Sequence, residues 1–219
     1  MSTHIIIPSR RPKKSHRHSP LVTKLIRAKE YSIVDVRRCL YDHSYDVTDK
    51  ECRNVFRHAR LRNLSRNPMR TLRGYKYEME FCLRYGNGEA HYIEGIKQYF
   101  ALHDRARGMR HLKIAATRNY KKGSYLYALL KMHAGDNDEG MKLLDRHKWI
   151  HNTFAVDKLW KQVKRSLHEV PIISRRSYGV NMMLIMPPRA CKLQDVENRC
   201  SKCFYYKEMD KFLQLVYRG

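Results

Sequence analysis

The sequence predicts an all-α protein: a stack of helical-hairpin repeats, closed by a capping helix and followed by a loop-rich C-terminal segment. Two central segments look like copies of one unit. The first begins at Ala90 and reaches Gly108, and the second begins at Gly123 and reaches Gly140. A period of about 33 residues is typical of helix–turn–helix repeats that bury apolar surface against each other. Amphipathic patterns on both sides of the two copies are expected to complete the stack.

Length and composition bound the class of protein. A chain of 219 residues with 42% hydrophobic residues is long enough for one domain with a real core, plus appendages. No run of about 18 apolar residues occurs, which predicts no membrane span. The beginning of the chain lacks a signal-peptide core, so reduced thiols and a location in the nucleus and/or cytoplasm are expected.

The chain is strongly basic, with a formal net charge of +24. Residues 1–18 contain basic residues and no acid, and they are interpreted as a disordered basic tail. Arg10-Arg11-Pro12-Lys13-Lys14 is typical of a nuclear-localisation patch. The remaining charge indicates attraction to nucleic acid or to acidic protein surfaces, or simply a solvated basic face.

Residues 19–66 are expected to form a helical segment. Ser19-Pro20 is typical of a helix start, and Ser32 to Asp35 and Thr48 to Glu51 resemble capping boxes. After the second box, apolar residues recur at helical spacing and basic residues lie opposite. The apolar set is Cys52, Val55, Phe56 and Ala59. Nucleic-acid binding, the alternative function, would use Arg53, Arg57, Arg60 and Arg62.

The repeat region is assigned to residues 67–169. After Asn67-Pro68, one helix is expected through Met69, Leu72, Met79 and Cys82, ending at the Gly86–Gly88 turn. The inner faces of the hairpins then follow helical spacing. They are Ala90, Ile93, Ile96, Lys97 and Phe100; Met109, Leu112, Ala115 and Ala116; Tyr125, Leu126, Leu129 and Met132; and Met141 and Leu144.

Two further features belong to this region. Tyr92, Tyr99, Tyr125 and Tyr127 are either core residues or a ligand platform, and an aromatic stripe at helical spacing favours core. Residues 153–168 have the clearest amphipathic pattern in the chain, which predicts a helix that caps the exposed end of the stack.

Residues 170–219 form the Cys-containing C-terminal segment. The apolar run from Met182 to Met186 predicts a strand or an extended segment, and Lys207 to Tyr217 predicts a short final helix. Cys200-x-x-Cys203 has the spacing of half a zinc site, and Cys191 offers a third ligand. Zinc is the only cofactor the sequence suggests, and ordinary reduced thiols are the alternative.

The residues resemble a known family. The stretch from Cys82 to Ala90, with Gly95, Tyr99-Phe100, Gly108, Leu112 and Ala115-Ala116, is similar to plant F-box-type proteins that carry Sel1/tetratricopeptide (TPR)-like repeats and a Cys-containing C-terminal segment. Cys200 to Glu208 resembles the C-terminal element of that group. Upstream, residues 33–64 resemble only the later part of the F-box, because its Leu-Pro start is missing. Residues 19–66 are therefore interpreted as an F-box remnant.

The resemblance implies a protein–protein interaction module, used as a substrate-recognition or adaptor subunit of an SCF-type ubiquitin ligase that docks a Skp1-type adaptor. Exposed polar residues on the concave face of the stack, namely Glu94, Gln98, Lys131 and His133, are expected to contact the protein partner. No pattern places a nucleophile beside a base, so the sequence does not predict an enzyme. A truncated product without independent function is a further alternative.

Overall fold

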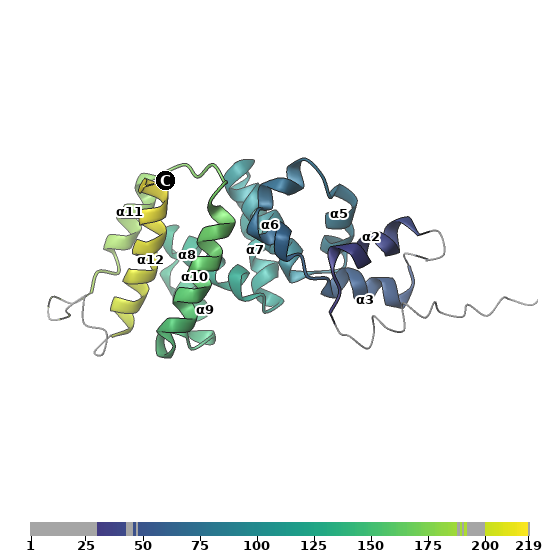
Figure 1. The fold of residues 1–219 in the computed structure, drawn as a ribbon. Helices are drawn as coiled ribbons and strands as arrows, with labels where there is room; N and C mark the ends of the chain where they lie inside the picture. The colour runs from purple at the N-terminus through teal and green to yellow at the C-terminus, as the bar shows by residue number, and fades with distance from the viewer. Residues whose placement is uncertain are drawn as a thin grey trace, which may run out of the picture. The chain divides into compact units, whose positions relative to one another are not determined.

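The computed structural model describes residues 30–42, 46, 48–187, 189, 191 and 200–218, and every named element within them is a helix (Figure 1). The predicted all-α class is confirmed. Residues 1–18 and the expected helix start at Ser19-Pro20 lie outside the described residues. Within the described residues, none of the helices combines the length and the apolar content that crossing a bilayer requires.

In the described part of the chain, five short elements precede the repeats. They are α2 (Ile33–Tyr41), α3 (Lys50–His58), α4 (Arg62–Arg66), the 3-10 helix η1 (Pro68–Leu72) and α5 (Lys76–Arg84). α2 packs against both α3 and α5. The continuous helix predicted from Met69 to Cys82 is wrong, because η1 and α5 are separate. Tyr75, just before α5, has a φ of 67°, in the left-handed region that a right-handed helix cannot include.

Local capping explains where α2 and α3 begin. Ser32 and Asp35 form the predicted capping box. The Asp35 carboxylate accepts a hydrogen bond from the Ser32 N–H, and the Ser32 hydroxyl accepts one from the backbone of the first turn. The cap of α3 is Asp49, whose side chain accepts from the Glu51 N–H, and not Thr48 as the second predicted box implied. The predicted inner face of α3 is confirmed, since its four apolar residues are buried.

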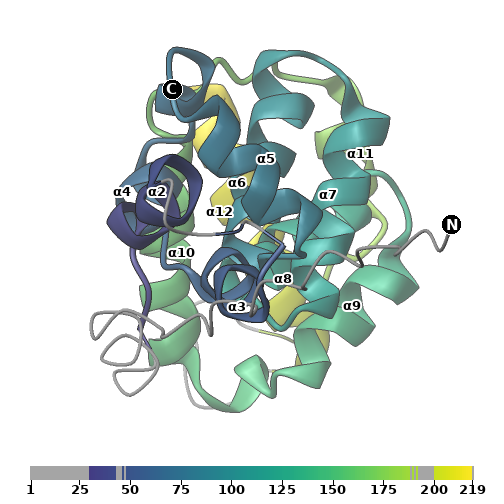
Figure 2. The same cartoon turned by 90° about the vertical axis from the view of Figure 1, so that its right-hand side faces the viewer.

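Two helical hairpins follow, as the repeat period predicts. The first consists of α6 (Gly88–Ile96), its π-helical continuation η2 (Lys97–Ala101) and α7 (Arg105–Thr117); the second consists of α8 (Lys121–His133) and α9 (Asn137–Arg146). α6 packs on α7, α8 packs on α9, and α7 joins the two hairpins by packing on α8 (Figure 2).

Glycine at equivalent places lets the helices of each hairpin approach closely. A Cβ atom at Gly108 would lie 2.6 Å from the backbone nitrogen of Tyr99, and one at Gly140 would lie 2.8 Å from the carbonyl oxygen of Ala128. Both distances are shorter than a van der Waals contact. The two glycines that mark the repeat in the sequence are therefore points of close approach within each hairpin.

The core runs through both hairpins and is continuous in α8. Every residue of α8 from Gly123 to Leu130 is buried. Tyr92, Tyr99, Tyr125 and Tyr127 are also buried, with 0%, 7%, 0% and 4% of their surface exposed. The favoured core interpretation of these tyrosines is confirmed, and a ligand platform is excluded because their rings are covered.

The predicted capping helix is α10 (Thr153–Leu167), preceded by the 3-10 turn η3 (Trp149–His151). Asn152 begins it by accepting a hydrogen bond from the Ala155 N–H at 2.9 Å. Val156, Leu159 and Val163 are buried on its inner face. Because α10 packs on α8, it covers apolar surface that a two-hairpin stack leaves open.

The C-terminal segment differs from its predicted form. Met182 and Met183 end a helix, α11 (Arg176–Met183), so the expected strand or extended segment is wrong. The final helix, α12 (Ser201–Arg218), begins before Lys207 and includes Cys203. Both helices pack on α8. The predicted loop-rich character therefore does not apply to the described part of this segment.

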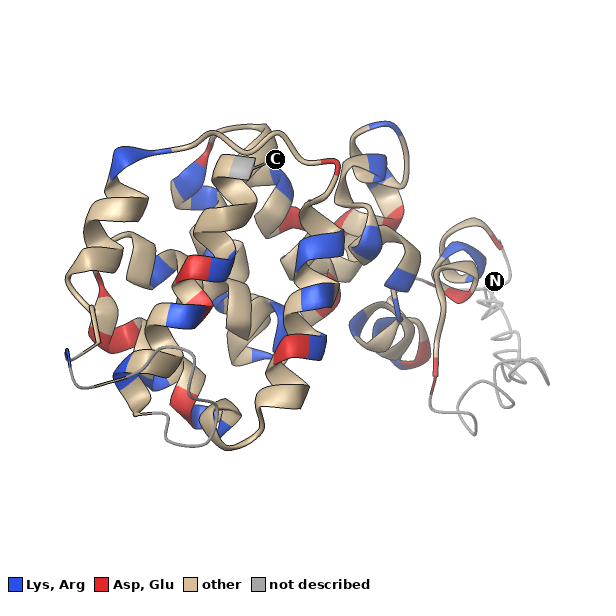
Figure 3. Ribbon diagram, turned by 60° about the vertical axis from the view of Figure 1, so that its left-hand side comes forward, with Lys and Arg blue, Asp and Glu red and all other residues tan. Residues whose placement is uncertain are grey.

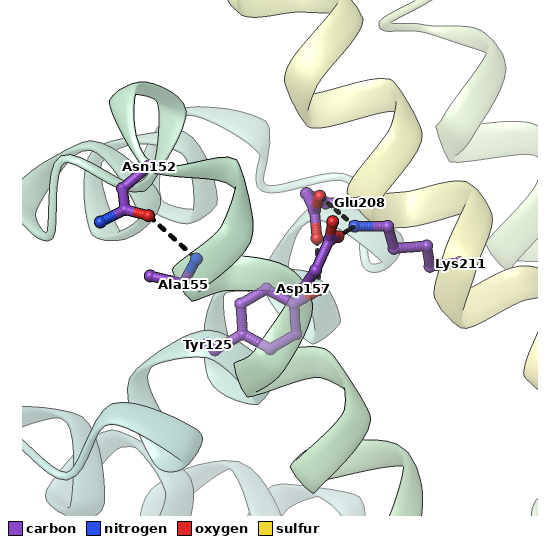
Figure 4. Close-up of polar contacts among 6 residues, drawn as sticks. All are labelled: Tyr125, Asn152, Ala155, Asp157, Glu208 and Lys211. Atoms are coloured by element: carbon purple, nitrogen blue, oxygen red, sulfur yellow. Dashed lines mark hydrogen bonds and ion pairs between the residues drawn. The ribbon is translucent and has the colours of Figure 1, made fainter. Parts of the chain in front are cut away.

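Polar contacts fasten α12 to the end of the stack (Figure 4). The Tyr125 hydroxyl of α8 donates to Glu208 at 2.5 Å, and Lys211 donates to Glu208 at 2.6 Å and to Asp157 of α10 at 2.7 Å. Burial raises the pKa of Tyr125 well above its ordinary value, and the neighbouring Glu208 carboxylate adds to the effect. These four side chains link α8, α10 and α12 through one network.

Candidate partner-binding groove

The four residues expected to contact a partner are not an exposed surface. Glu94, Gln98 and His133 are 7%, 7% and 0% exposed, so the predicted exposure is wrong for these three. Gln98 donates to Glu94 at 2.6 Å, and Lys97 pairs with the other Glu94 oxygen at 2.6 Å. These bonds satisfy polar groups inside the first hairpin, as buried polar groups require.

His133 and Lys131 also hold the second hairpin together. His133 Nδ1 lies 3.2 Å from the Tyr178 carbonyl of α11, and its ring packs against Phe212 of α12. Lys131 is half-buried and pairs with Asp136 at 2.5 Å and with Glu139 at 2.7 Å. Both residues are therefore committed to contacts within the chain.

A large groove of about 860 Å³ lies elsewhere, where segments distant in the sequence converge. Its walls come from the end of α3, from α4, from the start of α6, from the α7–α8 connection and from the outer side of α10. The repeats supply two of these walls, at the start of α6 and at the α7–α8 connection, and the helices before and after the repeats supply the others. The groove therefore exists only when the flanking helices are docked.

The lining of this groove is strongly basic. Among the described residues that line it, the one acidic residue is Glu89. Figure 3 shows in blue how densely Lys and Arg occur along the ribbon. The basic residues that line the groove are Arg57, Arg60, Arg62, Arg66, Arg118, Lys121, Lys122, Lys158 and Arg165.

Glu89 serves as an anchor for the walls. Its carboxylate accepts hydrogen bonds from the Leu61 N–H at 2.8 Å, the Ser65 hydroxyl at 2.6 Å and the Tyr120 hydroxyl at 2.9 Å. These donors belong to the α3–α4 connection, to α4 and to the α7–α8 connection. The carboxylate therefore joins three walls and leaves the surrounding arginines and lysines in excess.

Lys122 lies at the base of the groove. It donates to the Ser65 hydroxyl at 2.9 Å and lies over the Tyr92 and Tyr120 rings at 5.2 and 5.4 Å. Burial lowers the pKa of Lys122 to about 8, an effect that the nearby Arg66 adds to and Glu89 opposes. The lysine is thus a partly desolvated cation, which favours an anion beside it.

Most of the other groove cations form no salt bridge with a carboxylate of the described residues. Some cations outside the groove are paired, as is Arg37 with Glu78 at 2.7 Å. In the groove, by contrast, no salt bridge to a described carboxylate is formed by seven residues: Arg57, Arg62, Arg66, Arg118, Lys121, Lys158 and Arg165. Crowded like charges repel one another, so the arrangement favours an anionic partner.

Sequence reasoning found part of this site. Arg57, Arg60 and Arg62, proposed for nucleic-acid binding, line the groove, whereas Arg53 is exposed on α3 outside it. It missed Arg66, Arg118 and the basic residues of α10. The polar face of α10 was visible as a pattern, but only the folded structure brings α10 into contact with α4.

The three cysteines suggested as metal ligands also come together. Cys191 Sγ lies 3.6 Å from Cys200 Sγ, and Cys200 Sγ lies 3.4 Å from Cys203 Sγ. A hydrogen bond from the Cys203 N–H lowers the pKa of Cys200, while burial raises the pKa of Cys203 to about 11. The cluster is separate from the groove.

Comparisons with known proteins agree with the repeat architecture. Residues 68–168 match the family of plant tetratrico peptide repeats. Over 71 residues the chain is 37% identical to an F-box protein of Arabidopsis thaliana; this match covers 32% of this chain and 44% of the relative. No solved structure matches the chain.

The described helices define an all-α fold, and residues 68–168 of it are similar to plant tetratricopeptide repeats. The match to the Arabidopsis relative adds a partial similarity to an F-box protein, of which this chain covers less than half the length. Repeats of this class point to binding of other proteins.

Proposed function

We propose that the protein is an interaction module and that its basic groove holds an acidic segment of a partner protein. The observation that carries the proposal is the set of seven groove cations without a carboxylate partner in the described chain. A glutamate- or aspartate-rich peptide would supply the missing anions and relieve the repulsion among these cations. The bonds of Glu89 hold three walls in place before the partner arrives, which lowers the entropic cost of binding.

The groove suits an acidic peptide better than a single-stranded nucleic acid. Nucleic-acid grooves of that kind combine basic residues with exposed aromatic rings on which the bases stack. Here Trp149 is 5% exposed and is stacked on by His147, and the Tyr120 hydroxyl is held by Glu89. Neither ring is therefore available as a platform on which bases could stack. The test includes nucleic acid as the competing occupant of the groove.

The test measures binding of a fluorescent peptide of about ten residues, rich in Glu and Asp. Its competitors are a neutral Gln peptide and an oligonucleotide of equal charge. Arg66→Glu with Arg165→Glu places acids on two adjoining elements of the groove, α4 and α10, and should weaken peptide binding about tenfold or more. Tighter, stacking-dependent binding of the oligonucleotide would contradict the peptide assignment.

A charge-matched control separates the groove from the field of the whole protein. Lys113→Glu with Lys142→Glu makes the same change in net charge at exposed positions of α7 and α9 outside the groove. This pair should change the affinity by less than about threefold at physiological salt, where screening acts over about 8 Å. Equal losses in both double variants would show attraction to net charge alone.

The second candidate function is an adaptor or substrate-recognition subunit of an SCF-type ubiquitin ligase. It rests on the Arabidopsis F-box relative and on α2. Val34 and Tyr41 are 59% and 57% exposed on α2 and lie seven positions apart, on one helix face. An exposed apolar face on this F-box-like segment would suit a Skp1-type adaptor. The proposed location is the nucleus or the cytoplasm.

Co-purification with a Skp1-type adaptor tests this second role. Val34→Asp with Tyr41→Asp should abolish capture of the adaptor while the acidic peptide still binds, because α2 does not line the groove. If the folded protein does not capture the adaptor, the ligase role is excluded and the groove proposal is unaffected.

A further inference from the structure

The geometry points to a structural zinc site formed by the thiolates of Cys191, Cys200 and Cys203. The three residues come from two places in the chain: Cys191 follows α11, and Cys200 and Cys203 stand at the start of α12. Their sulfur atoms all lie within 4.8 Å of one another. This site is independent of the groove and of the proposed function.

The sulfur–sulfur distances fit a tetrahedral metal. Zinc binds thiolate at about 2.3 Å, and two ligands of a tetrahedron at that radius are about 3.8 Å apart. The observed separations are 3.6 Å from Cys191 to Cys200 and 3.4 Å from Cys200 to Cys203. A disulfide would need about 2.05 Å and would use only two of the three sulfurs.

The backbone at the start of α12 favours the thiolate form of Cys200. The Cys203 N–H donates to Cys200 Sγ at 3.4 Å, and the Phe204 N–H donates to the Cys200 carbonyl at 3.2 Å. Cys200 thus occupies the capping position of α12, where the N–H groups and the helix dipole stabilise a negative sulfur. Hydrogen bonds to the ligand sulfurs also orient them.

Zinc here would fasten the chain after α11 to the beginning of α12. α12 completes the network around Tyr125 and Glu208, so the metal would secure the helix that closes the end of the stack. Three thiolates leave one tetrahedral position for a fourth ligand, and no further described Cys, His, Asp or Glu joins this group.

The test uses the full chain, purified without a polyhistidine tag and kept reduced by a phosphine. Elemental analysis should find about one zinc per chain. Cys191→Ser and Cys200→Ser should each lower the zinc content to background. Cys82→Ser is the control, because it makes the same thiol-to-hydroxyl change at a fully buried cysteine outside the cluster and should retain zinc.

Two further measurements keep the result independent of misfolding. X-ray absorption at the zinc edge should show three sulfur neighbours at about 2.3 Å. Chelation should lower the melting temperature of the wild type but not that of Cys191→Ser, which changes a half-buried residue outside any helix. The assignment would be overturned if the folded, reduced wild type contained no zinc or if all variants contained equal zinc. A Cys191–Cys200 disulfide in protein supplied with the metal would also overturn it.

Discussion

At the scale of single residues, buried polar groups decide which side chains can be changed. Tyr125 is fully buried, and its hydroxyl is bonded to Glu208, which is itself 3% exposed. Tyr127, on the same helix, donates instead to Glu139 at 3.0 Å, and the Glu139 side chain is 39% exposed. The two tyrosines therefore allow a direct comparison between a buried hydrogen bond and one whose acceptor is accessible to solvent.

Tyr125→Phe should lower the free energy of unfolding by about 1–3 kcal/mol, because it removes a donor from a buried carboxylate. Tyr127→Phe should cost less than about 1 kcal/mol, since water can replace its hydroxyl at Glu139. Urea titration of both variants measures the difference. Equal losses would show that Glu208 does not depend on the Tyr125 hydroxyl.

The buried histidines predict a pH dependence. Burial lowers the pKa of His91 to about 4, and the neighbouring His111 lowers it further. The Nδ1 atoms of the two rings are 2.9 Å apart. Burial also lowers the pKa of His133 to about 4. Below an unfolded-state pKa of about 6.5, the unfolded chain binds protons that the folded chain does not. Stability should therefore be complete above about pH 6.5 and should fall as the pH drops towards 4.

The expected slope is up to about 1.4 kcal/mol per pH unit for each such histidine. Unfolding free energies between about pH 7 and pH 5 measure it, before most carboxylates titrate. His91→Gln should make the slope shallower, whereas His151→Gln, at an exposed residue of η3, should leave it unchanged. An identical slope without His91 would contradict the assignment.

At the scale of elements, the close approach of paired helices limits which glycines can acquire a side chain. Gly108→Ala would place a Cβ atom against the Tyr99 backbone and should destabilise the protein by about 1–3 kcal/mol. Gly179→Ala, inside α11, meets nothing within 4 Å and should stabilise it by about 0.5–1 kcal/mol. Thermal unfolding distinguishes the two signs. A neutral Gly108→Ala would indicate that η2 and α7 can separate.

Sequence patterns predicted the elements wherever periodicity was long and regular. The hairpins and α10 follow apolar spacing that a helix alone explains. The run from Met182 to Met186 was wrongly predicted to be a strand or an extended segment, because a short apolar segment fits a strand as well as a helix end. α12 was predicted to begin too late, because the polar residues Ser201 and Lys202 carry no apolar signal at its start.

At the scale of the molecule, charge opposes the compact state. The formal net charge of +24 and the crowded groove should make the unfolding temperature rise as sodium chloride increases from about 20 mM to about 200 mM. Arg66→Gln with Arg165→Gln should weaken this dependence more than Lys113→Gln with Lys142→Gln. Differential scanning fluorimetry measures both. Equal salt dependence in the two variants would show that the groove carries no excess repulsion.

The candidate site could be predicted only in part. The arginines of α3 and α4 were visible as a local basic run, but Arg118 and Arg165 meet them only through tertiary packing. The expected contact residues failed for a different reason. Glu94, Gln98 and His133 are polar, so the sequence suggested exposure, whereas the fold buries them, bonds Gln98 to Glu94 and places His133 Nδ1 beside the Tyr178 carbonyl.

The packing of α12 against α8 has an evolutionary consequence. Phe212 lies 5.0 Å from the His133 ring and 5.7 Å from the Tyr178 ring, measured between centroids. The family match ends at residue 168, before Tyr178 and Phe212. Selection should nevertheless act on the three positions as one unit, so that a larger ring at residue 133 in one lineage is accompanied by smaller side chains at 178 or 212.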